Sequence, residues 1–384
     1  MKLIYINIFF LLTLLSCDKE NTIPSSNQDL NWIRDNANPI LKAGFEAMPG
    51  KTALSVSDPS FIFDAQENKW EMWIAIGWFE NEQFKTGIKY AESVDGINWD
   101  VHDEICLKPS NIPTAWDFTS VETPMVLKLE SNPTEKKYIM WYSGGNITIN
   151  PLGEDYPRFQ IGMAYSADGI TFNKISESDS PYQQEGLVLK VEDAFPSLPS
   201  IATGIVADPS VIFHDNKLKM WFTSIGLTEN DEDIDGGICY AESEDGINWL
   251  VDNANPIQSL KRISEDFVAQ PTVLFNEANS EFEMWFNADY EAELTEVGMN
   301  GTIGFWHAHS VDGKNWIVNR ENGRDMIYGS NLNTEKYGLT VGCSVLYING
   351  EYVMIYGGLA SKELSQTFEN PWPYLHVLNR AIKE

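Results

Sequence analysis

Three carboxylic acids lie one or two residues before a proline that recurs along the chain in front of an apolar run. They are Asp58, Glu122 and Asp208, each followed within two residues by that proline. Carboxylates brought to one place are costly unless they share protons, bind a cation or perform acid–base chemistry. Glycoside hydrolysis uses such a set, because one carboxylic acid protonates the leaving oxygen while a carboxylate activates water or attacks the sugar.

The motif that carries these acids recurs along the chain and predicts a buried strand each time. The copies are 56–63, 121–127, 206–213 and 268–275, and a fifth copy without proline is 341–347. Proline is tolerated at the start of a strand because no ladder hydrogen bond is lost there. The apolar residues behind it are typical of a strand that is buried on both faces.

Each copy is followed by two further strand patterns and a turn. The second strands have an aromatic centre and are 70–74, 138–142, 218–222, 282–286 and 352–356. The third strands lead into a turn tag with an Asp-Gly pair, at 90–99, 163–172, 240–249 and 307–316. Asp-Gly favours a tight turn, so we expect Asp95, Asp168, Asp245 and Asp312 to form turns rather than to act in chemistry.

The fifth unit lacks its fourth strand, and the missing strand is found near the N-terminus. Residues 31–40 recur, with two substitutions, as 248–257, and residues 30–33 match the fourth strand of the other units. A last blade completed by the first strand of the chain leaves no open sheet edge. The sequence therefore predicts an all-β five-bladed β-propeller of four-stranded antiparallel blades, closed by the N-terminal strand.

In a propeller the innermost strands line the central channel, so equivalent positions on them form a ring. That ring is predicted to contain Asp58, Glu122 with Thr123, Asp208, Gln270 and Gly342. Gln270 could donate to or accept from a sugar hydroxyl, and Trp116 is a candidate for stacking on a sugar ring. The alternative is structural, because aspartate before proline often starts a turn or caps a strand.

With this ring and these blades, the chain resembles the five-bladed propeller glycosidases of the arabinanase, xylosidase and fructosidase superfamily, of the family 43 and 32 type. The resemblance implies that Asp58 is the base or nucleophile, that Glu122 is the general acid and that Asp208 tunes the acid or holds the substrate. Those families carry Asp, Asp, Glu on their first three blades, whereas this chain carries Asp, Glu, Asp. Asp208 as the acid, or a site that binds glycan without cleaving it, therefore remain alternatives.

No cofactor and no protein metal site are predicted from the residue spacing. His307 and His309 share one face of a strand but have no third ligand at a recognised spacing. The acidic loop 229–236 lacks the later glutamate that closes an EF-hand. A calcium ion in the channel stays open, since some related propellers hold a cation there.

The N-terminus is predicted to export and anchor the protein. Residues 1–16 carry one early lysine and an apolar run that is too short for a permanent membrane span, which is typical of a signal peptide. Leu14-Leu15-Ser16-Cys17 resembles a bacterial lipobox, which implies lipidation of Cys17, a tether over 17–29 and a domain over 30–384. An ordinary secretory signal cut elsewhere is the alternative. We expect a protein of the bacterial cell envelope that meets the membrane only through this lipid.

Composition narrows the possible partners. The formal net charge of -30 excludes nucleic acid as a partner, because phosphate binding needs clustered Lys and Arg, and it disfavours polyanionic substrates. The chain holds 13 Trp, 15 Tyr and 19 Phe, and aromatic faces suit sugar rings. We therefore expect a monomer that takes a neutral plant or algal carbohydrate. Cys106, Cys239 and Cys343 are expected to be structural, because an odd number without close pairing implies no disulfide framework.

Overall fold

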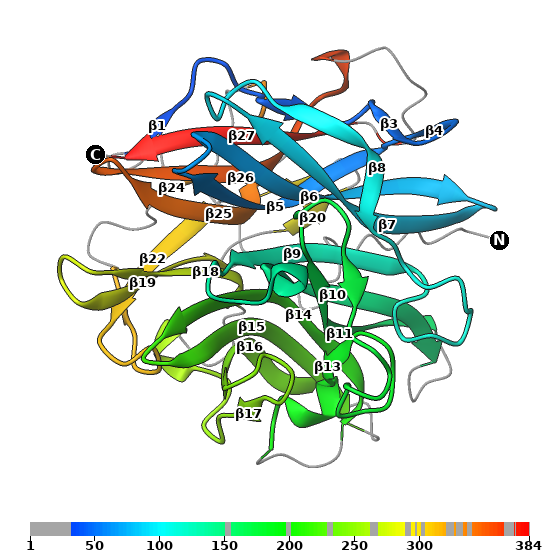
Figure 1. Ribbon diagram of the computed structural model, residues 1–384, viewed down its shortest axis with the longest axis vertical. Coiled ribbons are helices and arrows are strands. Elements are labelled where there is room, and N and C mark those ends of the chain that lie inside the picture. The colour runs from blue at the N-terminus through cyan, green and yellow to red at the C-terminus, as the bar shows by residue number, and fades with distance from the viewer. Residues whose placement is uncertain are drawn as a thin grey trace.

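The computed structural model describes residues 32–149, 155–196, 201–228, 233–261, 268–288, 293–295, 298–300, 304–319, 326–327, 333–335, 340–364, 372 and 374–383 (Figure 1). Strands make up nearly all of the regular structure in these residues, and the helices are single 3-10 turns, at Thr134–Lys136, Val191–Asp193, Gln258–Leu260 and Lys362–Leu364. No described helix is long and apolar enough to cross a membrane. The predicted signal peptide, Cys17 and the whole predicted tether lie outside the described residues.

The described strands form five antiparallel blades, in chain order, each with its first strand on the inside. Blade 1 has β5 (Ser55–Asp64), β6 (Lys69–Glu80), β7 (Gln83–Ser93) and β8 (Asp100–Leu107). Blade 2 has β9 (Ser120–Lys128), β10 (Tyr138–Ile149) and β11 (Asp155–Ser166), with β12 (Asn173–Lys174) and β13 (Leu187–Leu189) on its outer edge. Blade 3 has β14 (Ile201–His214), β15 (Lys217–Thr228), β16 (Asp233–Ser243) and β17 (Leu250–Val251). One parallel pair, Phe159 of β11 with Ile205 of β14, joins it to blade 2.

Blades 4 and 5 repeat this order. Blade 4 has β18 (Val268–Asn276), β19 (Glu281–Ala288) and β22 (Gly304–Ser310), with β23 (Ile317–Val318) and β24 (Met326–Ile327) paired to β22. Blade 5 has β25 (Thr340–Ile348), β26 (Glu351–Ser361) and β27 (Tyr374–Lys383), with β1 (Ile33–Arg34) and β2 (Leu41–Lys42) paired to β27. Two small hairpins, β3 (Glu46–Met48) with β4 (Lys51–Thr52) and β20 (Glu293–Thr295) with β21 (Gly298–Asn300), lie outside these sheets.

The inner strands close into a ring. Each of β5, β9, β14 and β18 contacts the next inner strand along the chain, and β25 returns to contact β5. In Figure 1 the blue start and the red end of the described chain lie side by side, where β1 pairs with β27. The all-β propeller predicted from the repeat is confirmed in the described residues, and the five inner strands contact one another in the order that five blades require.

The closing strand is held by a buried ion pair as well as by its ladder. Ile33 pairs with Ile382 and Arg34 with Ala381. Arg34 donates from Nε to Glu335 Oε1 (2.6 Å) and from Nη2 to Glu335 Oε2 (2.9 Å). Tyr356 also donates to Glu335, whose side chain is fully buried. Two charge-assisted bonds thus fix a strand that is only two residues long.

The hydrophobic core is divided among the interfaces between neighbouring blades. Tryptophans in the second strands of blades 1 to 3 fill these interfaces and donate from Nε1 to the glycine carbonyl of the next blade's turn tag. The pairs are Trp73 with Gly169 (2.7 Å), Trp141 with Gly246 (2.9 Å) and Trp221 with Gly313 (2.8 Å). In the first tag Asp95 accepts from the amides of Ile97 and Asn98, which confirms that this aspartate forms the turn. The equivalent aspartates make the same bonds in the other three tags.

Candidate active site

The site is built on a backbone distortion that recurs in every inner strand. The positive-φ residues are Asp58 (49°), Thr123 (46°), Asp208 (54°), Gln270 (53°) and Gly342 (56°). At each of them the pairing with the second strand shifts register, as at a β-bulge. Residues other than glycine adopt this conformation at a cost, and such strain gathers at functional sites. The bulge turns five equivalent side-chain positions toward one ring.

In blade 2 the position equivalent to Asp58 is Thr123, so Glu122 reaches the ring from the preceding residue. Thr123 shares a short hydroxyl–hydroxyl bond with Ser143, which lies on the second strand of its own blade. Glu122 is half-buried and pairs across the sheet with Ser143. The carboxylate of blade 2 is therefore presented differently from those of blades 1 and 3.

Side chains from one blade hold the bulge of the next. Ser143 Oγ accepts from the amide of Asp208 (3.0 Å), and Thr223 Oγ1 accepts from the amide of Gln270 (2.9 Å). The amide of Gly342 donates to Asn287 Oδ1 (3.3 Å) in the same way. Ser143, Thr223 and Asn287 occupy the same position of their second strands, two residues after the core tryptophan.

Each carboxylate of the ring accepts a hydrogen bond from a hydroxyl group. Ser57 Oγ donates to Asp58 Oδ2 (2.7 Å), and Thr86 Oγ1 donates to Glu122 Oε2 (3.2 Å). Thr223 bonds the Asp208 side chain, which lowers the pKa of that carboxyl against the effect of burial. These hydroxyl groups orient the carboxylates without neutralising their charge.

Burial raises the pKa of all three carboxyl groups. The pKa of Asp58 rises to about 7, mainly through burial and partly through the charge of Asp208. The pKa of Glu122 rises to about 8, through burial and then through the charges of Asp58 and Asp208. Burial raises the pKa of Asp208 to about 6. Asp58, Glu122 and Asp208 lie on inner strands that contact one another, close enough that the charge of one carboxyl group alters the pKa of another.

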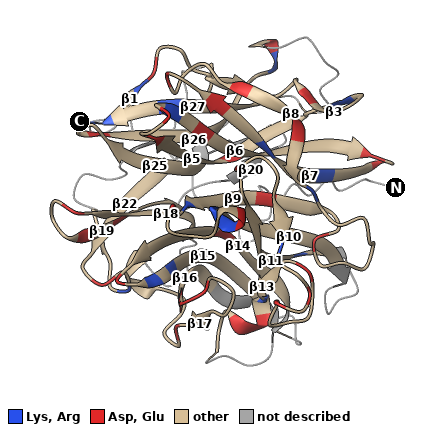
Figure 2. Cartoon of the chain, in the orientation of Figure 1, with Lys and Arg blue, Asp and Glu red and all other residues tan. Residues whose placement is uncertain are grey.

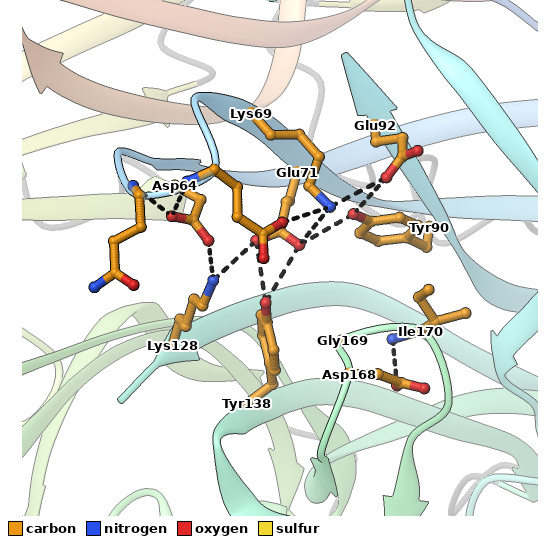
Figure 3. Close-up of polar contacts among 12 residues, drawn as sticks. Asp64, Lys69, Glu71, Tyr90, Glu92, Lys128, Tyr138, Asp168, Gly169 and Ile170 are labelled. Carbon is orange, nitrogen blue, oxygen red and sulfur yellow. Dashed lines mark hydrogen bonds and ion pairs between the residues drawn. The ribbon is translucent and has the colours of Figure 1, made fainter. Parts of the chain in front are cut away.

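At the opposite end of β5, the carboxylates form ion pairs with lysines and support the fold. There Asp64 bonds Lys128, and Glu71 lies 3.7 Å from both Lys69 Nζ and Lys128 Nζ (Figure 3). The bond with Lys128 lowers the pKa of Asp64 to about 2. Acidic residues outnumber basic ones along the chain, 56 to 26 (Figure 2). In the described residues none of the three ring carboxylates forms an ion pair with Lys or Arg, so no cation offsets the rise in their pKa values.

Gln270 and Gly342 complete the ring. Gln270 Oε1 accepts from the amide of Gly342 (3.2 Å), so its amide nitrogen is the end that can donate to a ligand. Gly342 lies against blade 1, since a Cβ atom on it would be 2.5 Å from Asp58 Oδ1. The ring position that lacks a side chain is thus the one that leaves room for the carboxylate of Asp58.

Trp116 lies in the connection between β8 and β9 and packs against blade 2. It is 8% exposed, its ring stacks on Tyr142 (5.8 Å between centroids, 23°), and its Nε1 donates to the carbonyl of Glu185 (2.9 Å). It also fills the space beside Gly144, which lacks a side chain. Among the described residues these are packing contacts, and none joins Trp116 to the three carboxylates.

Sequence reasoning missed the hydroxyl groups around the carboxylates. Ser143 and Thr223 could have been found, because each follows the aromatic pair of a second strand at a constant spacing. Thr86 gives no such signal, since its position on the third strand is not part of the repeated motif.

The described residues contain no group of three or more His, Cys, Asp or Glu side chains arranged to hold a metal ion. His307, one of the two histidines considered as ligands, has its Nε2 3.2 Å from Glu283 Oε2, at the interface of blades 4 and 5. Tyr352 donates to the same carboxylate (2.9 Å). The contacts of His307 are therefore those of an interface residue.

In comparisons with known proteins, the chain resembles solved structures of glycosidases. No family model matches the chain, and neither does any curated protein. A solved structure described as a glycoside hydrolase superposes with a TM-score of 0.61 at 14% identity, over 90% of this chain and 92% of that one. A thermostable family-43 glycoside hydrolase gives 0.52 at 13% identity, over 85% and 89%. A family 32 β-fructofuranosidase of Bombyx mori gives 0.54 at 12% identity, over 90% and 63%. At these identities the likeness establishes the fold, and the chain has the β-propeller fold of the glycosidases that its motifs resemble.

Proposed function

We propose that this chain is a glycoside hydrolase that acts on a neutral plant or algal polysaccharide or oligosaccharide. One observation carries the proposal: three carboxyl groups with raised pKa values share a ring of strained backbone and have no cationic partner in the described residues. Strained, desolvated carboxylates reduce stability, so a fold retains them where they serve a function.

Glu122 is the proposed general acid. Its pKa of about 8 keeps it protonated at neutral pH. Thr86 Oγ1 accepts from the amide of Val121 (3.2 Å), so its single proton goes to Glu122 Oε2. The acidic proton of Glu122 can pass to the leaving oxygen as the glycosidic bond breaks.

Asp58 is the proposed base or nucleophile. Ser57 donates to its carboxylate, which favours the charged form that can remove a proton from water or attack the anomeric carbon. Asp208 lies close enough to raise the pKa of both other acids, and we assign it to tuning the acid or holding the substrate. The amide nitrogen of Gln270 is suited to a sugar hydroxyl. With a net charge of -30, the protein favours an uncharged sugar.

Purified protein incubated with a panel of aryl glycosides and plant or algal oligosaccharides tests the proposal through the release of reducing ends. Asp58→Asn and Glu122→Gln are each expected to abolish release on the substrate found while leaving the thermal midpoint nearly unchanged or higher. Asp95→Asn, in the first turn tag, is the control that should keep full activity. Full activity in both Asp58→Asn and Glu122→Gln would contradict the assignment.

A non-catalytic glycan-binding protein is the second candidate, favoured by the order of the carboxylates. The first three blades carry Asp, Glu, Asp rather than the Asp, Asp, Glu of the propeller glycosidases that the chain resembles. The same fold can serve binding without chemistry. Calorimetric heat on adding an oligosaccharide, with no new reducing ends after long incubation, would select this candidate.

The cellular setting is part of the proposal. We propose that the protein is exported and anchored to the bacterial cell envelope by a lipid on Cys17, from the lipobox-like sequence that ends there. Growth with an alkyne fatty acid should label the full chain, and Cys17→Ser should remove the label. Equal labelling of the two proteins would contradict the anchor.

A further inference from the structure

Two hairpins extend past the inner strands on the face of the propeller where those strands begin. Gly77 of β6 pairs with Ser55, the first residue of β5, and β6 continues to Glu80 before β7 returns. In blade 5, Gly358 pairs with Thr340, the first residue of β25, and β26 continues beyond it to Ser361. Both extensions therefore lie on the same side of the ring as the carboxylate positions.

Phe84, in the first of these hairpins, is two residues from the threonine that bonds the proposed acid. Phe84 and Thr86 are two residues apart on β7, so their side chains share one face of the blade. Thr86 on that face is the hydroxyl that bonds Glu122 Oε2 at 3.2 Å. Two residues of a strand span about 7 Å. The ring of Phe84 thus stands one side-chain row outside the carboxyl group of Glu122.

Gly77 allows the ring of Phe84 to lean toward the centre. A Cβ atom on Gly77 would be 2.2 Å from Phe84 Cζ and 2.5 Å from Ser55 Oγ, so the phenyl ring occupies the space of a side chain there. It lies across β6 and reaches the first residue of the inner strand. Ser55 is three residues before Asp58 on that strand.

Trp372 adds a second aromatic ring from the other end of the chain. Its ring meets that of Phe84 edge to face, at 5.7 Å between centroids and 80°. It lies parallel to the ring of Tyr374, at 6.3 Å and 1°. Tyr374 is buried, whereas Phe84 and Trp372 are half-buried. The two outer rings of this cluster thus keep part of their surface exposed.

The hairpin that carries Phe84 is acidic at its tip, with Glu80 and Glu82. His376 packs against Trp372 at 5.3 Å, and burial lowers the pKa of His376 to about 4, so it is neutral in ordinary buffers. Lys85, between Phe84 and Thr86 in sequence, donates from Nζ to the carbonyl of Phe118 (2.8 Å). An aromatic surface suits the C–H faces of a neutral sugar, whereas the two glutamates of the hairpin tip would repel the carboxylate of a uronic acid.

We infer that Phe84 and Trp372 form a subsite for a neutral sugar on the leaving-group side of the bond that Glu122 protonates. The inference rests on the proposed function, since it takes Glu122 as the acid. It goes further by naming the residues that bind the departing sugar. Because the acid acts on the leaving oxygen, the row of side chains immediately outside it meets the departing sugar.

The test compares two substrates with the same reacting sugar. One is the oligosaccharide that the wild-type protein cleaves, and the other is the glycosyl fluoride of its non-reducing sugar, which has no leaving sugar. Phe84→Ala and Trp372→Ala are each expected to lower kcat/KM for the oligosaccharide roughly 10- to 30-fold, because one aromatic stacking contact is lost. The kcat/KM for the glycosyl fluoride should change less than about threefold. Phe213→Ala, an exposed phenylalanine at the far end of β14, is the matched control and should change neither.

Binding supplies a readout that is separate from catalysis. In the Glu122→Gln background, calorimetry should show that Phe84→Ala weakens oligosaccharide binding by a similar factor. If Phe84→Ala does not fold, Phe84→Leu keeps the apolar volume without the ring. Equal losses on both substrates, or no loss on the oligosaccharide, would overturn the subsite while leaving the hydrolase intact. A wild-type protein that neither cleaves nor binds any glycan would overturn the proposed function, and the subsite with it.

Discussion

Gly342 of blade 5 faces the carboxylate of Asp58 in blade 1 so closely that a Cβ atom at residue 342 would lie 2.5 Å from Asp58 Oδ1. The contact joins the last and first inner strands of the ring. The other four equivalent positions carry side chains, and this one cannot without moving the proposed base. The empty position is therefore part of the site.

Gly342→Ala is expected to lower kcat by roughly 10- to 100-fold, because small displacements of a catalytic group are costly. Its φ of +56° also adds about 1 kcal/mol of backbone strain to any residue with a Cβ atom. Gly350→Ala is the matched control, since Gly350 has φ +91° and nothing within 4 Å of its added Cβ. Both variants should lose stability in urea unfolding, and only Gly342→Ala should lose activity. A similar kcat in the two would mean that Asp58 tolerates the displacement.

Thr86 is expected to position Glu122 rather than to touch the substrate. Thr86→Val keeps the shape of the side chain and removes the hydroxyl that donates to Glu122 Oε2. We expect kcat to fall roughly 5- to 20-fold, and the basic limb of the pH–rate profile to move to higher pH, because the lost bond favoured the ionised form. Thr86→Ser should restore both. A loss of kcat with an unchanged profile in Thr86→Val would assign Thr86 a packing role only.

The ring carboxylates are expected to make the folded protein less stable as the pH rises. Their folded-state pKa values of about 7, 8 and 6 exceed the unfolded values near 4. The stabilisation that comes from burying these carboxyl groups in their neutral form is therefore fully present below about pH 4. It is lost as the pH rises through the folded-state pKa values. Glu122→Gln should melt close to the wild-type midpoint at about pH 4 and about 1 to 3 °C above it at about pH 8.

Asp64 should behave in the opposite way, because its bond with Lys128 lowers its pKa to about 2. Its contribution is present above the unfolded pKa and is lost as the pH falls through the folded value. Asp64→Asn is thus expected to lower the thermal midpoint at about pH 8. Comparing each variant with the wild type at the same pH removes the effect of the other acidic residues. A Glu122→Gln variant that melts below the wild type at the higher pH would contradict the burial of this acid.

The repeat made the fold predictable, because each blade encodes the same local pattern of strand, turn and tryptophan. The ring of candidate site residues could be predicted from the same repeat, since equivalent positions on the inner strands surround one channel. The register within blade 2 could also have been read from the proline, which aligns Thr123 rather than Glu122 with Asp58. The packing of Trp116 on Tyr142 could not, because a tryptophan in a connection looks the same in sequence whether it is exposed or packed.

The contacts that distinguish the site from its repeats arise between residues far apart in sequence. Thr86 meets Glu122, and Phe84 meets Trp372, through the packing of different blades or hairpins. No spacing along the chain encodes such a contact. Sequence patterns therefore located the carboxylates, whereas the groups that orient and surround them required the structure.

The ion pair between Arg34 and Glu335 is expected to hold the ring closed. Glu335 is fully buried, and removing one partner of a buried ion pair typically costs about 3 to 5 kcal/mol. Arg34→Met should lower the free energy of unfolding in urea by that amount. Lys314→Met is the matched control, because Lys314 pairs with Asp252 at 2.7 Å but is 47% exposed, and exposed pairs contribute less than about 1 kcal/mol. The double variant Arg34→Met/Glu335→Gln removes the buried charge as well and should recover part of the loss. If Arg34→Met costs no more than Lys314→Met, the two-residue strand β1 is held by its ladder and by Trp32 rather than by this pair.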